Sequence, residues 1–281
     1  MKRIILLLII FVISLTGCAS WNFPATGGDP QKAQSFGYHP LDPLPVDLRH
    51  EGELTNERIM KSLPDETMRL AIGKISGSGG ITYGPAATGY KGSSYVVVLD
   101  YIKFNTRSFG AKLSKIESAS YTDMGIQVPS KAVQALSMPY FLKAILAKEG
   151  EADKIVPVYV GVGLRLTANV TVHEGSVNLG SLFALGLAAQ AKQVSGTLVV
   201  QTLGISGENI SSIIPMPAEI NSSTIQNAIL SLGTIKAKMY ESDTIITPRV
   251  VGVYNNLGGG SETINGFISS LLQEPQFLNI K

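Results

Sequence analysis

The stretch VGVGLRLTANVTVH, residues 160–173, alternates strictly between two kinds of side chain. Apolar residues occupy the even positions from Val162 to Val172, while the odd positions between them and His173 are polar or glycine. A period of two predicts a long β-strand within residues 155–173, with one apolar and one polar face. In a water-surrounded domain the apolar face packs on a core. The alternative is a membrane-inserted sheet, in which that face meets lipid and strands of about 9–11 residues are long enough.

Other segments of the chain also have strand character. Residues 95–104 (YVVVLDYIKF) are mostly β-branched or aromatic, a composition that favours extended backbone. Residues 76–92 are rich in glycine and serine and are expected to form a loop. The remaining predicted strands are residues 68–75, 194–205 and 244–254, with weaker signals over 112–120 and 210–214.

Three segments carry the helical spacing of apolar residues, at i, i+3 and i+4. They are residues 129–148, 222–240 and 264–272. Helices near 130–148 and 222–240 are expected to cover one face of a mixed or antiparallel sheet, so the predicted fold class is α+β. Residues 176–191 are apolar and rich in small residues, but too short to span a bilayer as a helix.

The composition excludes several classes of protein. The chain has 281 residues, of which 44% are hydrophobic and 16% charged, too apolar for a disordered protein. One cysteine and three histidines exclude an intrachain disulfide and any zinc site built from several thiolates. No metal site and no cofactor are predicted. The formal net charge is only +2, so no nucleic-acid partner is predicted either.

The first eighteen residues indicate export. Lys2 and Arg3 precede the apolar run from Ile4 to Ile13, which is too short to span a membrane and is typical of a signal peptide. The following tetrapeptide, Leu15-Thr16-Gly17-Cys18, resembles the lipobox of bacterial lipoproteins. The resemblance implies that residues 1–17 are a signal peptide and that Cys18 is acylated. The alternative is an ordinary cleaved signal peptide with an incidental cysteine.

Acylation of Cys18 would anchor the chain, because each buried methylene contributes about 0.8 kcal/mol to membrane binding. No aspartate follows Cys18, which in the lipoprotein family implies an outer-membrane location. Loss of Lys2 and Arg3 with the leader would lower the basic residues from 23 to 21, equal to the 21 acidic residues. The mature chain would then have no net formal charge.

The mature chain is predicted to have three parts. Residues 18–65 contain many prolines and are expected to form a lipid-anchored tether, either extended or wrapped over the body. Residues 66–256 are expected to form the α+β domain. Residues 257–281 are expected to be a glycine-rich link and a short C-terminal helix.

No catalytic motif is found in the sequence. The chain lacks a Gly-x-Ser-x-Gly elbow, a Ser-x-x-Lys motif and the Lys-Ser/Thr ending of a Walker loop after Gly73–Gly80. His173 could act as a base with a distant serine, but the spacing identifies none, while His39 and His50 lie in the expected tether. The scattered acids do not single out a glycosidase pair. They are Asp100, Glu117, Asp123, Glu149, Glu151, Asp153, Glu174 and Glu208.

Residues 156–214 are similar to the lipoproteins that form the curli secretion channel. The similarity rests on a strand, the turn Ser206-Gly207-Glu208 and an expected second strand, within LVVQTLGISGENISSI (residues 198–213). It implies a subunit of an oligomeric export channel. The apolar stretch SLFALGLAA departs from the family, which would have a more polar strand there.

The sequence therefore predicts a non-catalytic, outer-membrane-anchored bacterial lipoprotein that assembles or secretes an envelope or surface structure. Its predicted partners are the membrane, through acylated Cys18, and a second copy of itself or other envelope assembly proteins. The alternatives are a lipid-anchored periplasmic hydrolase that uses His173, or a ligand-binding lipoprotein with a pocket under residues 76–92.

Overall fold

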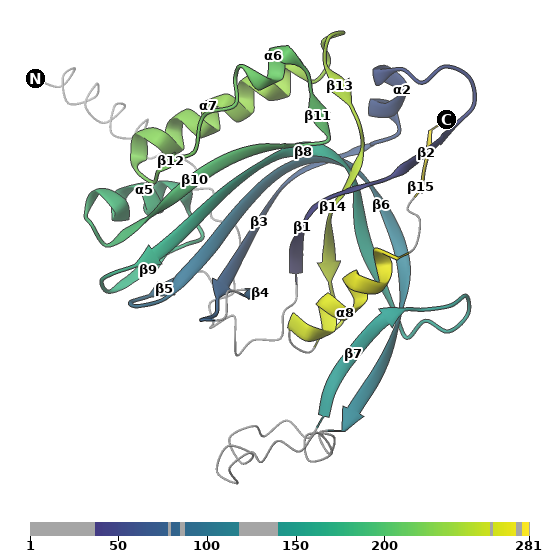
Figure 1. The fold of residues 1–281 in the computed structure, drawn as a ribbon, viewed down its shortest axis with the longest axis horizontal. Coiled ribbons are helices and arrows are strands. Elements are labelled where there is room, and N and C mark those ends of the chain that lie inside the picture. The colour runs from purple at the N-terminus through teal and green to yellow at the C-terminus, as the bar shows by residue number, and fades with distance from the viewer. Residues whose placement is uncertain are drawn as a thin grey trace, which may run out of the picture.

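The computed structural model describes residues 37–77, 80–84, 88–117, 140–258, 261–273 and 277–280. Most of these residues belong to one curved, largely antiparallel sheet with helices packed on it, which confirms the α+β fold class (Figure 1). The predicted signal peptide 1–17, the predicted acylation site Cys18 and residues 18–36 of the predicted tether lie outside the described residues.

Two long antiparallel strands form the middle of the sheet. Strand β6 (Ser94–Glu117) pairs with β8 (Lys154–Val172) from Ser94↔Thr171 to Ala111↔Lys154. This confirms the strand predicted over residues 155–173, and it joins the two strands expected over 95–104 and 112–120 into one, as far as the described residues reach.

Both long strands change partners along their length. The C-terminal half of β8 pairs with β10 (Val194–Leu203), and its N-terminal half pairs with β14 (Arg249–Asn255). On its other edge, β6 pairs with β3 (Asp65–Ile75) through its N-terminal half and with β7 (Tyr140–Leu146) through its C-terminal end. Beyond them lie β12 (Ala218–Glu219) next to β10, β1 (Gly37–Pro45) next to β14, and β4 (Ile81–Gly84) next to β3.

Helices α7 (Ser222–Lys238) and α5 (Leu182–Gln190) cover one face of the sheet (Figure 1). Asn221 caps α7 by a capping box with Thr224, which satisfies backbone donors at the start of the helix. The buried stripe of α7, from Ile225 to Ile235, packs into the main core. The helix predicted over 222–240 is therefore confirmed, and so is the one over 264–272, as α8 (Ser261–Leu271), which packs on β7.

The remaining elements are short. They are α2 (Asn56–Lys61), α6 (Glu208–Ser211), and the strand pairs β2 (Asp47–His50) with β15 (Phe277–Ile280), β5 (Thr88–Tyr90) with β9 (Ser176–Asn178), and β11 (Ile205–Ser206) with β13 (Ile245–Ile246).

The tether prediction is wrong for residues 37–65, which belong to the folded body. Strand β1 pairs with β14 and, because the sheet curls, also contacts β3. Its prolines do not prevent pairing for two reasons. Among the described strands β1 is an edge strand, and its register shifts between Pro40 and Leu44, so missing N–H groups are tolerated.

Three further predictions need correction. Residues 140–146, expected to be helical, form β7, whose pairing with β6 overrides the helix-like spacing; residues 118–139 lie outside the described part. In place of the strand expected over 210–214, residues 210 and 211 end helix α6 and residues 212–214 form a turn. The loop expected over 76–92 contains the short strands β4 and β5.

Candidate functional site

The apolar face of β8 packs on the core of the protein itself. Val162, Leu164, Leu166 and Ala168 are all completely buried in the main cluster beneath the helices. In the described part of the chain no helix is long and apolar enough to cross a membrane.

The polar face of β8 holds a buried ion pair. Arg165 donates from Nε to Asp100 Oδ1 at 2.7 Å and from Nη2 to Asp100 Oδ2 at 2.6 Å. Tyr38 donates its hydroxyl to the same Oδ2 at 2.5 Å. We call Tyr38, Asp100 and Arg165 the buried ion-pair cluster. The alternating pattern placed Arg165 on the solvent-facing side of its strand, but Arg165 is 5% exposed and Asp100 is fully buried.

The cluster ties four strands together. Besides joining β8 to Asp100 on β6, Arg165 donates to the carbonyl of Leu41 on β1 at 2.7 Å and to that of Val251 on β14 at 3.0 Å. A buried charge is tolerated only when it is paired and hydrogen-bonded, as it is here. The carbonyl acceptors on β1 and β14 mean that the guanidinium also fixes where these strands lie.

The electrostatics of the cluster keep Tyr38 neutral and Arg165 charged. Burial and the neighbouring Asp100 carboxylate raise the pKa of Tyr38 well above its usual value, so its hydroxyl stays protonated and donates. Burial alone would lower the pKa of Arg165, but the hydrogen bonds and charge of Asp100 outweigh it and raise that pKa. With two guanidinium donors and one hydroxyl on its carboxylate, Asp100 is suited to holding strands rather than to moving protons.

His173 has a serine partner that the sequence did not identify. Its Nε2 lies 2.7 Å from Ser195 Oγ, because the end of β8 runs beside the start of β10. A serine next to a histidine is the core of a nucleophilic pair. Both residues are exposed, however, and none of the described carboxylates is hydrogen-bonded to His173 to orient it.

The other two histidines have structural surroundings. His39 is buried against the ring of Tyr83, 4.9 Å between centroids, and burial lowers its pKa to about 4, so it is neutral at pH 7. His50 is exposed, with Nδ1 2.9 Å from the carbonyl oxygen of Gly52. Within the described ranges, no group of three His, Cys, Asp or Glu residues could hold a metal ion.

The structure does not gather the sequence-predicted acids into one site. Glu149, Glu151 and Asp153 lie in the exposed turn between β7 and β8, where Asp153 accepts a hydrogen bond from the backbone of Leu113. Glu208 is exposed in the first turn of α6. Asp123 and the side chain of Glu117 lie outside the described part.

Large apolar side chains point away from the core on the helical layer. Phe183 on α5 and Leu230 on α7 are 70% and 62% exposed, and Leu187 and Ile229 are about half exposed. We call these four residues the helical face. The two helices form one layer, since α5 packs so tightly on α7 that a Cβ atom on Gly186 would lie 2.9 Å from Ser222 Cα.

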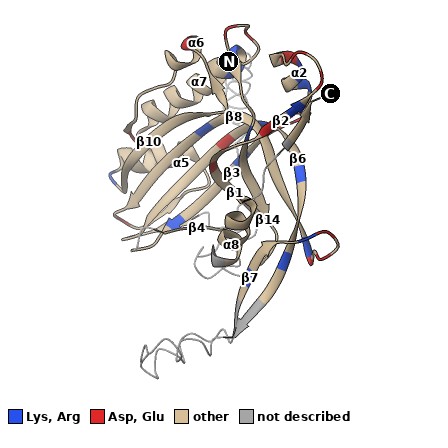
Figure 2. Cartoon of the chain, turned by 45° about the vertical axis from the view of Figure 1, so that its right-hand side comes forward, with Lys and Arg blue, Asp and Glu red and all other residues tan. Residues whose placement is uncertain are grey.

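The helical face is almost free of charge. Helix α5 has no charged residue, and α7 has only Lys236 and Lys238 near its end, so the ribbon of these helices is almost entirely tan in Figure 2. Both lysines are paired, with Glu66 and Glu241. Single exposed apolar residues are ordinary, but a group of them on one uncharged layer is typical of an interaction surface.

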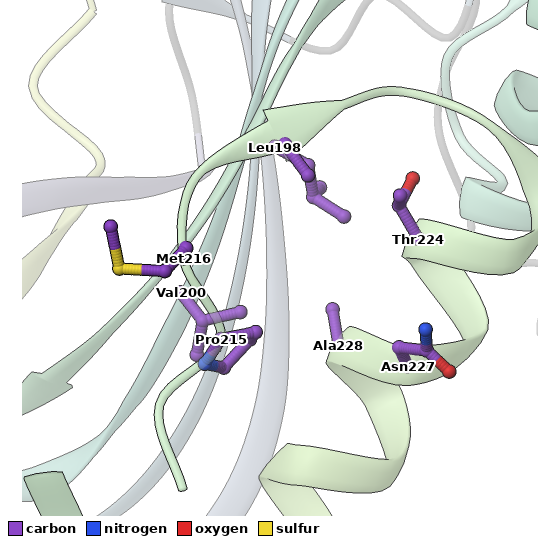
Figure 3. Close-up of a pocket in the computed structure, with 8 residues that line it drawn as sticks. Leu198, Val200, Pro215, Met216, Thr224, Asn227 and Ala228 are labelled. Carbon is purple, nitrogen blue, oxygen red and sulfur yellow. The ribbon is translucent and has the colours of Figure 1, made fainter. Parts of the chain in front are cut away.

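An apolar groove lies between α7 and β10. Its volume is about 220 Å³, and Figure 3 shows Leu198 and Val200 of β10 on one side and Ala228 of α7 on the other. Met216, which is 84% exposed, lies at its edge. The ligand pocket predicted under residues 76–92 remains a prediction, because only part of that loop lies within the described residues.

Comparison of the chain with models of protein families, with curated proteins and with solved structures gives no match. The segment behind the similarity to curli-channel lipoproteins differs from the expected hairpin. After β11 the backbone turns at Gly207 and forms α6 instead of a second strand.

Sequence reasoning missed the buried ion-pair cluster, although two signals for it were present. Asp100 is the lone acid in YVVVLDYIKF, and Arg165 is the lone charge in the alternating stretch. Asp100 is unusual in a strand that is otherwise suited to burial, but Arg165 stands on the polar side of the alternation, so it indicates a buried pair only once the register of β8 with β6 is known. Nothing comparable marked Tyr38, because its role depends on β1 joining the sheet.

Proposed function

We propose that this chain is an outer-membrane-anchored bacterial lipoprotein with a non-catalytic role in assembling or secreting an envelope or surface structure. The lipobox ending at Cys18 supports the anchor. The helical face carries the binding role, because an uncharged layer that exposes Phe183, Leu187, Ile229 and Leu230 is suited to burial against another protein.

The partner we favour is a second copy of the chain, which would make the protein an oligomeric subunit, with an export channel as the most specific form. A hydrophobic face of this kind forms self-complementary contacts in symmetric oligomers. Aromatic and large aliphatic side chains at the centre of such a contact contribute most of the binding energy.

The test is the oligomeric state of the detergent-extracted mature protein, measured by light scattering. We expect an oligomer, and we expect Phe183→Ser with Leu187→Ser to raise the concentration for half-dissociation by about tenfold or more. The matched control is Gln190→Ser with Gln226→Ser, two exposed polar residues of the same helices. A monomeric wild-type protein would rule out the oligomeric subunit.

The anchor is tested separately. We expect Cys18→Ala to accumulate as an unacylated precursor that takes up no labelled palmitate. Continued palmitate incorporation by this variant would contradict the anchor without bearing on the helical face.

A lipid-anchored hydrolase is the second candidate, favoured by the 2.7 Å contact between His173 and Ser195. It predicts that His173→Ala and Ser195→Ala each abolish hydrolysis of an activated ester by the purified protein. The binding function predicts that neither substitution changes the oligomer or any background turnover.

A further inference from the structure

Arg69 on β3 has no anionic partner among the described side chains. In the sheet register it lies directly opposite Asp100, yet Asp100 is bonded to Arg165 and Tyr38 instead. Among the described residues Arg69 forms no ion pair, and its buried Nε has no hydrogen-bond partner. Unsatisfied buried donors are rare in folded proteins and need an explanation.

Three aromatic rings surround the guanidinium group. Its Cζ atom lies 4.6 Å from the ring centroid of Tyr159, 5.9 Å from that of Tyr38 and 6.0 Å from that of Phe104. The rings also hold one another, with Phe104 and Tyr159 edge to face at 5.1 Å. The aromatic contacts therefore fix the position of the charge without neutralising it.

The charges of this region do not balance. Among the described residues, Arg69 and Arg165 contribute two positive charges, and Asp100 is the one carboxylate that lies opposite both of them in the strand register. The tyrosines do not compensate, because burial raises the pKa of Tyr38 and of Tyr159 and keeps both neutral. Arg69 is only half-buried, and the neighbouring Tyr254 is 39% exposed, so the region reaches the surface.

We propose that Arg69, held by the rings of Tyr38, Phe104 and Tyr159, binds an oxyanion, either a carboxylate or a phosphate group. A guanidinium group presents a planar fork of donors that matches the oxygens of both. The aromatic walls lower the local polarity and so strengthen such a contact relative to one in open water. This site is independent of the proposed membrane anchor and of the helical face.

The experiment titrates the full-length protein with inorganic phosphate and, in a second arm, with acetate, at constant ionic strength set by chloride. Thermal unfolding and broadening of the phosphate ³¹P resonance are the readouts. We expect a rise in Tm of about 3–6 °C at a concentration about ten times the dissociation constant, and a phosphate broadening that saturates as the site fills. A larger response to one anion identifies whether the natural group is a phosphate or a carboxylate.

Two variants separate specific binding from a general salt effect. We expect Arg69→Met to lose the response, and Lys103→Met, which removes a cation from the opposite face of the same sheet, to keep it. If Arg69→Met does not fold, Arg69→Lys replaces it, with an expected loss of at least half of the Tm shift because the fork is gone. Equal shifts in wild type and Arg69 variants, or no rise in Tm with either anion, would overturn the proposal.

Discussion

The two faces of β8 are built from the same short stretch of chain but hold the fold together in different ways. On one face, the apolar residues at the even positions from Val162 to Val172 supply only hydrocarbon to the core beneath α5 and α7. On the other, Arg165 lies between Asp100 and the backbone carbonyls of Leu41 and Val251. The first face stabilises in proportion to the area it buries, while the second stabilises only when every partner is in place.

The comparison shows which part of the fold each face determines. Hydrophobic contact has no preferred direction, so the apolar face requires that something packs on it but does not determine the position of β1. The guanidinium group has donors in fixed directions, and two of them reach carbonyls on β1 and β14. The polar face of β8 therefore determines the position of β1.

The largest effect should come from breaking the polar face. We expect Asp100→Ala to destabilise the protein by about 3–5 kcal/mol, because Arg165 is left buried without its counter-charge. Chemical denaturation by urea measures this loss. Replacing both residues by leucine should cost clearly less than Asp100→Ala, and an equally severe double variant would show that the ion pair itself is needed.

The next effect tests the apolar face. We expect Leu166→Ala, beside Arg165 in sequence but completely buried on the other side, to cost roughly 2–4 kcal/mol, by lost burial and the cavity left behind. The loss should be independent of pH and salt in urea titrations. A loss below about 1 kcal/mol would mean that the helical layer relaxes into the space.

A pH titration tests the burial of His39, which lies on β1 against the ring of Tyr83. Burial lowers the pKa of His39 to about 4, below its usual value of 6.5, so the proton is bound more tightly by the unfolded chain. Stability should fall as the pH drops from about 6.5 towards 4, by at most roughly 3 kcal/mol. His39→Gln should flatten this part of the profile, whereas an unchanged slope would assign it to other groups.

The smallest expected effect concerns helix α7, which packs over the apolar face of β8. Asn221 accepts from the backbone N–H of Thr224 at 2.9 Å and caps α7. We expect Asn221→Ala to cost about 1 kcal/mol, measured by urea denaturation, and Asn221→Ser to cost almost nothing because serine also caps. Equal losses in the two variants would argue that the cap is not the cause.

Most of the long elements could be predicted from local pattern. The alternation in β8, the apolar spacing of α7 and the β-branched run of β6 each follow from which side chains must be buried. The predictions failed at β1, whose prolines argue against a strand, and at β7, whose spacing suits a helix. In both, pairing with a distant strand decided the conformation.

The candidate site was less accessible to sequence reasoning than the fold. The sequence offered Asp100, His173 and the other acids as isolated residues, and no spacing connected them. Arg165, Asp100 and Tyr38 are 62 to 127 positions apart, and they meet only because β1, β6 and β8 lie in one sheet. The same holds for His173 and Ser195, which the register of β8 and β10 brings together.

By itself, the sequence determined the fold class and the two-faced strand, because hydrophobic periodicity is a local property, and a short local motif predicts a lipoprotein leader. Only the tertiary structure decided that the polar face of β8 is buried around Arg165, that residues 37–65 belong to the body and that Arg69 forms no ion pair with the described residues. These depend on which strands pair across the sheet, and pairing joins residues far apart in the chain.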